Sequence, residues 1–318
     1  MKKLLVIIPA FNEEDNIAEV INKIPRSIPG IGKIEILIIN DGSTDTTPDI
    51  AKNMGIGVID NYKNMGLGFS FRRGLNHAVE NGFDMMVNID GDNQFDPAEI
   101  PKLLEPILDG SSEFVTASRF IDRKPIHNMP IAKFWGNRLM SILVSRLVGK
   151  RYQDVSCGFR AYSKRALLSL NLQGRFTYTQ ETFIDLSFKG LIIKEVPIDV
   201  KYFPSRRSKV ASNLFIYAIN TLKIILGTYR DYRPLAFFSI ISLTFLIIGI
   251  AFEIVLLWTY ITRGTFSPNI WSGFVGAAFF FLSVIFFIVG LSADILNRIR
   301  INQESILFLL KRDSHNKS

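Results

Sequence analysis

The stretch Asn88-Ile89-Asp90-Gly91-Asp92-Asn93-Gln94 places two carboxylates at the end of a predicted strand. Residues 83–89 include an apolar run that is expected to form a buried strand. In an extended chain, Asp90 and Asp92 point to the same side, and Gly91 between them lets the backbone approach a ligand closely. Carboxylate oxygens suit Mg²⁺ or Mn²⁺, which can bridge a diphosphate and neutralise charge on a leaving group. The stretch therefore predicts a metal-dependent site beyond the carboxyl end of a strand.

Turn chemistry is the alternative explanation of the same residues, because Asp, Gly and Asn are common turn formers. From this stretch alone, a metal site and a plain turn both remain open. A calcium loop of the EF-hand type fits this stretch poorly. Counted from Asp90, its sixth position is Phe95 rather than glycine, and its twelfth is Pro101 rather than glutamate.

Apolar runs alternate with helical segments on the N-terminal side of this stretch. Strands are expected at residues 4–8, 34–39, 57–60 and 83–89, and helices ending near Ile24, Asn53 and Asn81. This alternation predicts an α/β domain with a parallel sheet and right-handed crossovers. A dinucleotide-binding domain is excluded, because the turn after the first strand, residues 9–14, contains no glycine and cannot supply Gly-x-Gly-x-x-Gly.

The composition indicates a basic protein with a strongly apolar part. The chain has 318 residues, of which 48% are hydrophobic, and a mean hydropathy of +0.22. The apolar excess lies near the C-terminus. The net charge of +8 suggests an anionic partner, such as a nucleotide, a nucleic acid or a membrane surface. A single cysteine, Cys157, excludes an internal disulfide framework.

Two segments combine basic and aromatic side chains at helical spacing. Residues 126–148 repeat apolar side chains every three or four positions among Lys133, Arg138 and Arg146, and residues 212–229 repeat the pattern. Amphipathic helices of this kind suit a membrane interface. A core-facing helix is the alternative for residues 126–148. We expect both helices to lie along a bilayer and to hold the N-terminal domain against it.

Two long apolar segments follow. Residues 235–261 are apolar apart from Glu253, and residues 270–291 form a second run, so each exceeds the roughly 20 residues that cross the hydrocarbon core. Basic residues flank the pair and only Arg263 lies between them, so the positive-inside rule places both termini in the cytoplasm. Glu253 could end the first span, pair with another subunit or contact lipid. Residues 293–310 predict a cytoplasmic amphipathic helix.

Several motifs occur in an order typical of one enzyme family. They are Pro-Ala-Phe-Asn-Glu-Glu at 9–14, Asn-Asp-Gly-Ser-Thr-Asp at 40–45, Asn-x-Gly-x-Gly at 64–68 and Asp-Gly-Asp-x-Gln at 90–94. The set resembles the inverting family 2 glycosyltransferases. With Ser118-Arg119, the run from Asp154 to Arg160 and the basic residues 206–209, it is similar to the branch that transfers sugars to polyprenyl phosphates. The resemblance covers about residues 1–230.

The resemblance implies the residues that surround a nucleotide sugar and its metal ion. The expected nucleotide-sugar contacts are Pro9, Phe11, Glu13, Ile39, Asp41 and Gly91. The expected metal and diphosphate contacts are Asp90, Asp92 and Gln94, of which the two aspartates are assigned to catalysis. The side-chain chemistry agrees, because an aromatic ring can cover a base and carboxylates accept hydrogen bonds from base N–H groups or ribose hydroxyls.

The resemblance also implies an acceptor-phosphate site. Its candidates are Arg119, Lys133, Asn137, Arg206 and Arg207. Arginine offers a planar fork that binds phosphate oxygens bidentately, whereas general attraction to anionic lipids is the alternative role of these charges. Asp154, the third catalytic candidate, would orient the acceptor or a sugar hydroxyl, act as a base, or pair with Arg160.

The expected protein is a membrane-anchored, metal-dependent, inverting glycosyltransferase. It would transfer a hexose from UDP-glucose to undecaprenyl phosphate at the cytoplasmic face of the cell membrane, with Mg²⁺ or Mn²⁺ as cofactor. The nearest alternative is GDP-mannose with dolichyl phosphate. Its partners would be the nucleotide sugar, the polyprenyl phosphate and the bilayer, without nucleic acid. A homo-oligomer and a separate flippase for the product stay open.

Three regions are expected along the chain. Residues 1–230 would form a GT-A-type, Rossmann-like α/β domain with the two interfacial helices, residues 231–292 a multi-pass transmembrane hairpin, and residues 293–318 a cytoplasmic helix and tail. A non-catalytic nucleotide-sugar binder is disfavoured, because it would not need both Asp90 and Asp92. Two spans argue against a flippase. A processive polysaccharide synthase is disfavoured because Gln-x-x-Arg-Trp is absent.

Overall fold

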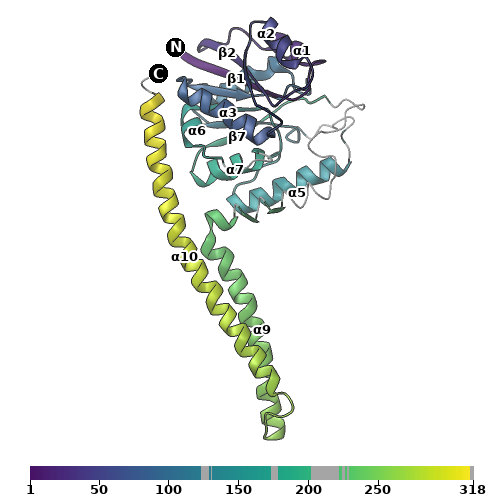
Figure 1. Ribbon diagram of the computed structural model, residues 1–318, viewed down its shortest axis with the longest axis vertical. Coiled ribbons are helices and arrows are strands. Elements are labelled where there is room, and N and C mark those ends of the chain that lie inside the picture. Colours follow the sequence, from purple (N-terminus) through teal and green to yellow (C-terminus); the bar gives the residue numbers. More distant parts are fainter. Residues whose placement is uncertain are drawn as a thin grey trace. The chain divides into compact units, whose positions relative to one another are not determined.

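The computed structural model describes residues 1–122, 129, 131–172, 178–201, 222–223, 226–227 and 229–315. The chain forms two compact units: the first comprises Met1–Thr221 and Ile306–Ser318, and the second comprises Leu222–Ser305 (Figure 1). Each unit has its own packing.

Seven strands of the first unit form one sheet among the described residues, in the order β3-β2-β1-β4-β6-β5-β7. The strands are β1 Lys2–Ala10, β2 Ile31–Asn40, β3 Gly57–Asp60, β4 Met85–Asn88, β5 Phe114–Ser118, β6 Arg160–Ser163 and β7 Ile193–Pro197. The helices of this unit are α1 Ile17–Lys23, α2 Thr47–Asn53, α3 Leu67–Glu80, α4 Ile100–Leu108 after the short η1 Pro97–Glu99, α5 Ile131–Val148, α6 Lys164–Ser169 and α7 Thr179–Phe188.

The expected α/β fold is confirmed, and the sheet is mixed rather than wholly parallel. β1 pairs in parallel with both β2 and β4, as the alternation of strands and helices predicts. β6 instead runs antiparallel to β4 and β5, and Arg160 at its start lies opposite Asn88 at the carboxyl end of β4. The segment that leads into β6 therefore lies at the same edge of the sheet as the acidic stretch after β4.

Apolar side chains on both faces of the sheet fix the strands that carry the site. In β1, every residue from Leu4 to Ile8 is almost completely buried, as in a strand covered on two sides. Leu4, Val6 and Ile8 share one core cluster with apolar residues of α1 and α4. The chain passes from β1 to β2 and β3 on one side and then returns to β4 on the other. Such a switch point is where open α/β sheets bind ligands.

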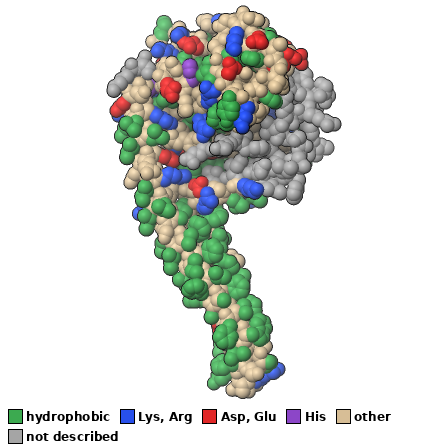
Figure 2. Space-filling model, in the orientation of Figure 1, with side chains coloured by type: hydrophobic (Ala, Val, Ile, Leu, Met, Phe, Trp, Pro, Cys, Tyr) green, Lys and Arg blue, Asp and Glu red, His purple; other side chains and the backbone are tan. Residues whose placement is uncertain are grey.

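The second unit contains most of two long apolar helices. They are α9 Pro234–Arg263 and α10 Ile270–His315, and both are long and apolar enough to cross a membrane. Only 11% and 17% of their most apolar windows are buried, unlike the core helix of a soluble domain. Figure 2 shows their surface covered mainly by hydrophobic side chains. The Ser242 hydroxyl donates to the Ser283 carbonyl over 2.9 Å, which joins the two helices.

The C-terminal end of α10 belongs to the first compact unit. Lys311 Nζ donates to the Leu170 carbonyl and to Asn171 Oδ1, both over 2.8 Å. His315 Nε2 lies 2.9 Å from the Phe83 carbonyl oxygen, just before β4. The helix expected over residues 293–310 is therefore a continuation of α10, and the last part of α10 packs within the first unit.

Candidate active site

Carboxylates from two neighbouring strands meet at the switch point. Asp90 and Asp92 follow β4, and Glu13 follows β1. A Cβ atom on Gly91 would lie 3.6 Å from Glu13 Cγ, which places the Glu13 side chain beside the acidic stretch. Glu13 is 8% exposed. The structure thus brings together three of the acidic residues that the sequence motifs single out.

Gly158 makes room for the Asp90 carboxylate. A Cβ atom at position 158 would lie 2.6 Å from Asp90 Oδ2, a distance that side chains do not tolerate. The Gly158 carbonyl oxygen accepts hydrogen bonds from Asn88 Nδ2 over 2.8 Å and from the Tyr178 hydroxyl over 3.3 Å. These buried contacts hold the segment before β6 against the end of β4, so Asp90 has a fixed position.

The electrostatics of Asp90 indicate a site that needs a cation. The pKa of Asp90 is raised to about 7, chiefly by burial and then by the neighbouring charges of Asp92 and Glu13, although Arg160 and Arg119 act to lower it. The protein's own cations therefore do not offset the repulsion and desolvation of the acidic group. A divalent ion would supply the missing positive charge.

Asp90 and Asp92 are the residues that would hold such an ion, with Gln94 nearby in the same turn. Gln94 donates its backbone N–H to Asp92 Oδ1 over 3.1 Å, which shapes the turn. Within the described residues, no group of three or more His, Cys, Asp or Glu side chains could hold a metal. A site with few protein carboxylates fits Mg²⁺ or Mn²⁺, because such ions retain water and take further oxygens from substrate phosphates.

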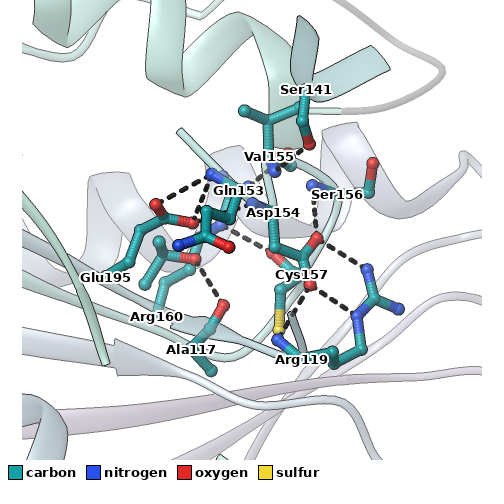
Figure 3. A network of polar contacts seen from close by, with 11 residues as sticks. Ala117, Arg119, Ser141, Gln153, Asp154, Val155, Ser156, Cys157, Arg160 and Glu195 are labelled. Carbon is teal, nitrogen blue, oxygen red and sulfur yellow. Dashed lines mark hydrogen bonds and ion pairs between the residues drawn. The ribbon is translucent and has the colours of Figure 1, made fainter. Parts of the chain in front are cut away.

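A second network fixes Asp154 (Figure 3). Arg119 Nε donates to Asp154 Oδ2 over 2.6 Å, and Arg119 Nη2 donates to Asp154 Oδ1 over 2.7 Å. The Asp154 side chain has no exposed surface. Burial alone would raise the pKa of Asp154, but Arg119 outweighs it and holds the pKa below its usual value. Asp154 is therefore ionised at neutral pH and is a poor general base.

Glu195 on β7 supports this network from the other side. Its carboxylate accepts the backbone N–H of Gln153 over 2.9 Å and that of Asp154 over 2.7 Å, as Figure 3 shows. Burial raises the pKa of Glu195, and these hydrogen bonds oppose the shift. Glu195 thus positions the backbone from which Asp154 reaches Arg119. No sequence motif pointed to it.

Arg160, the first residue of β6, is completely buried. Its guanidinium donates to three backbone carbonyls, those of Val155, Cys157 and Thr179, over 2.7 to 3.0 Å. It therefore fastens the segment before β6 to the start of α7, and its charge lowers the pKa of Asp90. From the sequence, Arg160 was one candidate for the ion-pair partner of Asp154. Asp154 instead forms its ion pair with Arg119, so the structure does not bear out the pairing with Arg160.

Asp41, at the end of β2, holds the turn before α3. Its Oδ1 atom accepts from Asn61 Nδ2 over 2.7 Å and from the Met65 N–H over 2.9 Å. Its Oδ2 atom accepts from the Gly66 N–H over 2.9 Å. The Asn-x-Gly-x-Gly motif is thus tied to the Asp41 motif. Any contact of Asp41 with a nucleotide would be in addition to these bonds.

The remaining candidates for the nucleotide pocket lie at the carboxyl ends of β1 and β2 or directly after β1. Pro9 of β1 is paired with Ile39 of β2, and Ile39 has no exposed surface. Both residues therefore belong to the packed interior of the sheet, beneath the candidate nucleotide pocket. Phe11 is half-buried in the turn after β1. Asn12 next to it and Asn93 in the acidic turn have φ angles of +53° and +56°. Backbone strain of this kind concentrates at functional sites.

The helix α5 carries Lys133 and Asn137, and it brings Lys133 close to the acidic group. Burial lowers the pKa of Lys133 and so does Arg119, whereas Asp92, Asp90 and Asp154 raise it, which places the ammonium in the field of the site. Asn137, one turn later, is 6% exposed, and its Nδ2 atom has no hydrogen-bond partner among the described residues. Such a buried donor is costly unless a ligand uses it.

The face of α5 turned away from the core is also apolar. Met140 and Val144 are buried, whereas Trp135 is 64% exposed and Leu139 is 57% exposed. The helix therefore has a core-facing side and an exposed apolar side. Arg206, Arg207 and most of the second expected helix, residues 212–229, lie outside the described residues.

Comparison with known proteins assigns the family. The sequence model of glycosyl transferase family 2 matches residues 5–170, which is more than half of the chain. The chain belongs to glycosyl transferase family 2. All of the acidic residues described above, except Glu195, lie within the matched region.

Relatives with assigned activities resemble this family 2 chain over most of their length. The UDP-N-acetylglucosamine–dolichyl-phosphate N-acetylglucosaminyltransferase of Methanococcus voltae is 34% identical over 63% of this chain and 86% of its own. The polyprenol monophosphomannose synthase of Mycolicibacterium smegmatis is 25% identical over 62% and 82%. The undecaprenyl-phosphate 4-deoxy-4-formamido-L-arabinose transferase of Klebsiella pneumoniae is 27% identical and covers 91% of this chain and 84% of its own.

Solved structures confirm the GT-A-type fold. Glucosyl-3-phosphoglycerate synthase from Mycobacterium tuberculosis, in complex with UDP, aligns with a TM-score of 0.57 and 24% identity. The alignment covers 71% of this chain and 80% of that one. At this identity the likeness establishes the fold alone.

Proposed function

We propose that this glycosyltransferase transfers a hexose from a nucleotide sugar to the phosphate of a polyprenyl phosphate. The observation that carries the proposal is the position of Lys133 and Asn137. Both lie on the core-facing side of a helix whose opposite side exposes apolar residues, and Lys133 lies in the field of Asp90 and Asp92. If the exposed apolar side of α5 lies on a lipid surface, the phosphate of a lipid in that surface could contact Lys133 and Asn137. Relatives that act on dolichyl, polyprenyl and undecaprenyl phosphates support the same acceptor class.

The chain's own residues account for the reaction as follows. A phosphate monoester is already an anion near neutral pH, so the attacking oxygen needs no general base. Arg119, Lys133 and Asn137 would hold the phosphate in line with the anomeric carbon, opposite the nucleotide. The new C–O bond forms as the bond to the nucleoside diphosphate breaks, so the anomeric configuration inverts. Asp154 would hold Arg119 in place, because its low pKa suits a permanent counter-ion.

The expected Mg²⁺ or Mn²⁺ would be held by Asp90 and Asp92, with Gln94 nearby. When bound, it would stabilise negative charge on the departing diphosphate. UDP-glucose with undecaprenyl phosphate is the proposed substrate pair, and GDP-mannose with dolichyl phosphate is the alternative. Glu13, Asp41 and Phe11 would face the nucleotide, above the buried Pro9 and Ile39.

Transfer assays with the purified full-length protein test this function. Nucleotide sugars, led by UDP-glucose and GDP-mannose, are incubated with undecaprenyl or dolichyl phosphate and Mn²⁺. We expect a sugar-phosphate-lipid product, and an α-linked donor should give a β-linked product in the proton NMR coupling of the anomeric centre. A product with retained configuration would contradict the single displacement. Transfer to water or to soluble sugars alone would contradict the acceptor.

The proposed location is the cell membrane, with residues 231–292 as a hairpin and with the catalytic unit and both termini in the cytoplasm. The apolar surfaces of α9 and α10 support the hairpin, and the flanking basic residues support its orientation. A homo-oligomer and a separate flippase for the product remain compatible with this arrangement. The short loop between the helices would face the outside.

Cysteine labelling in intact cells checks the orientation. The native Cys157 is 1% exposed, so the background should be low. We expect Ser267→Cys, in the loop between α9 and α10, to react with an impermeant maleimide. Asn53→Cys, which is exposed at the end of α2, should react only after the cells are permeabilised. Labelling of Asn53→Cys in intact cells would show that the catalytic unit faces outward.

A further inference from the structure

A pocket of about 280 Å³ lies between the C-terminal half of α5 and the segment that follows this helix. One face of α5 lines it, because the contributing residues recur at helical spacing: Arg138, Ser141, Ser145 and Arg146. Arg151 and Tyr152 line the opposite side. None of these residues belongs to the group around Asp90.

Hydrogen bonds fix the two walls of this pocket to each other. Ser145 Oγ accepts the Tyr152 N–H over 2.8 Å and donates to the Tyr152 carbonyl over 3.2 Å. Ser141 Oγ accepts the Val155 N–H over 3.3 Å. Gly149, with a φ of +73°, ends the helix and turns the chain back along it. The pocket is therefore formed before any ligand binds.

Three arginines line the pocket: Arg138, Arg146 and Arg151. Within the described residues, no hydrogen bond or ion pair is made by the guanidinium groups of Arg138, Arg146 or Arg151. A helix C-terminus attracts cations, but only within its last turn. This effect explains Arg146 and not Arg138, which lies two turns earlier, about 12 Å along the axis. Unpaired arginine forks are suited to phosphate oxygens.

Exposed apolar residues border the same pocket. Ile142 lines it and is 43% exposed, and Leu139 beside it on the helix is 57% exposed. We infer that the pocket binds the phosphate of an anionic phospholipid, whose acyl chains lie against Leu139 and Ile142. The volume suits a headgroup, since it is below the roughly 300–1,000 Å³ of pockets that enclose drug-sized ligands.

This lipid site is separate from the proposed acceptor site. Arg138, at the near end of the pocket, lies five residues after Lys133, about 8 Å along the helix and about 140° around it, and Ile142 lies about 14 Å from Lys133 along the helix. A bound phospholipid would anchor the far end of α5 at the membrane surface and leave the end with Lys133 to receive the acceptor. The inference shares with the proposed function only the position of α5 at the bilayer, and it does not depend on sugar transfer.

Lipid-dependent thermal stability of the full-length protein in non-ionic detergent tests the site. Phosphatidylglycerol, phosphatidylcholine and glycerol 3-phosphate are titrated separately, and the midpoint of the Tm increase gives an apparent Kd. We expect a saturable Tm increase with phosphatidylglycerol only. Arg138→Gln, Arg146→Gln and Arg151→Gln should each weaken this Kd by about fivefold, and the triple variant by about a hundredfold. Arg26→Gln, at an exposed arginine outside the pocket, is the matched control.

Each alternative has its own outcome. An equal response to glycerol 3-phosphate would identify a soluble phosphate as the ligand and overturn the lipid site. Equal weakening by Arg26→Gln would mean diffuse attraction instead of a pocket, and an unchanged Kd in the triple variant would remove the arginines from binding. Should the triple variant be unstable without lipid, Arg151→Gln decides, because this exposed residue lies outside the helix. Transfer activity is measured in parallel, so a failure of the proposed function is recorded independently.

Discussion

Asp92→Asn and Asp90→Asn are each expected to reduce sugar transfer at least about a thousandfold, because the metal ion contributes several kcal/mol of charge stabilisation. Both carboxylates lie on one turn after β4, and Asp90 packs against Gly158 with little room to move. An amide keeps the shape of each side chain and removes its charge. The measurement is the initial rate of product formation at saturating Mn²⁺, donor and acceptor.

The matched control is Asp109→Asn, in the exposed turn between α4 and β5, which should keep wild-type activity. Removal of divalent ions with a chelator should inactivate the wild type, and added Mn²⁺ should restore it. Full turnover by either site variant, or by wild type in excess chelator, would remove the metal role from these residues.

The raised pKa of Asp90 adds a pH dependence to the same site. The folded-state pKa is about 7, above the ordinary 3.8, so the folded protein binds this proton more tightly than the unfolded chain does. Without metal, the stability gained from this proton is present at low pH and is lost as the pH rises through about 7. A divalent ion needs the carboxylate instead. We therefore expect Mn²⁺ to raise the Tm strongly near pH 8 and hardly near pH 5.5.

Asp90→Asn separates this effect from a general loss of folding. Near pH 8 the metal-free variant should have a higher Tm than the metal-free wild type, because a buried charge is gone, with about 2–4 °C for each kcal/mol. Its Tm should no longer respond to Mn²⁺. If Asp90→Asn were instead less stable than the wild type and inactive, misfolding would explain its loss of activity.

The sequence predicts β1 and β4 because each contains a continuous apolar run. β1 and β4 are buried on both faces, and such strands are readable from composition alone. β6 is different. It is four residues long and begins with a charged Arg160, and its pairing with β4 and β5 joins segments more than forty residues apart. No local pattern reports its antiparallel direction, so the sequence could predict only a parallel sheet.

In the site too, features that follow from local sequence were predictable, and contacts between distant segments were not. The ends of β1 and β4 meet because the sheet brings them together, so Glu13, Asp90 and Asp92 were predictable as neighbours. Which arginine pairs with Asp154 was not, because Arg160 is close in sequence and Arg119 is 35 residues away. Arg160 donates to backbone carbonyls instead. Glu195 lies farther along the chain, on the short strand β7, and belongs to no motif, so nothing in the sequence marks it.

Arg119→Ala is expected to have two large effects of different origin. It leaves the fully buried Asp154 carboxylate without its partner, which should lower the free energy of unfolding by about 3–5 kcal/mol. It should also raise the KM for polyprenyl phosphate at least about tenfold, because a charge-assisted hydrogen bond to the phosphate is lost. Binding of the nucleotide sugar should change little. Chemical denaturation and steady-state kinetics measure the two effects separately.

The double variant Arg119→Ala/Asp154→Ala decides whether Arg119 contacts the acceptor. Removing both partners leaves no unpaired buried charge, so the double variant should be more stable than Arg119→Ala. If Arg119 binds the phosphate directly, the acceptor KM stays high although stability returns. If Arg119 acts only by holding Asp154, the two single variants and the double variant share one KM. Arg119→Lys keeps the charge but lacks the planar fork, so its acceptor KM should lie between those of the wild type and Arg119→Ala.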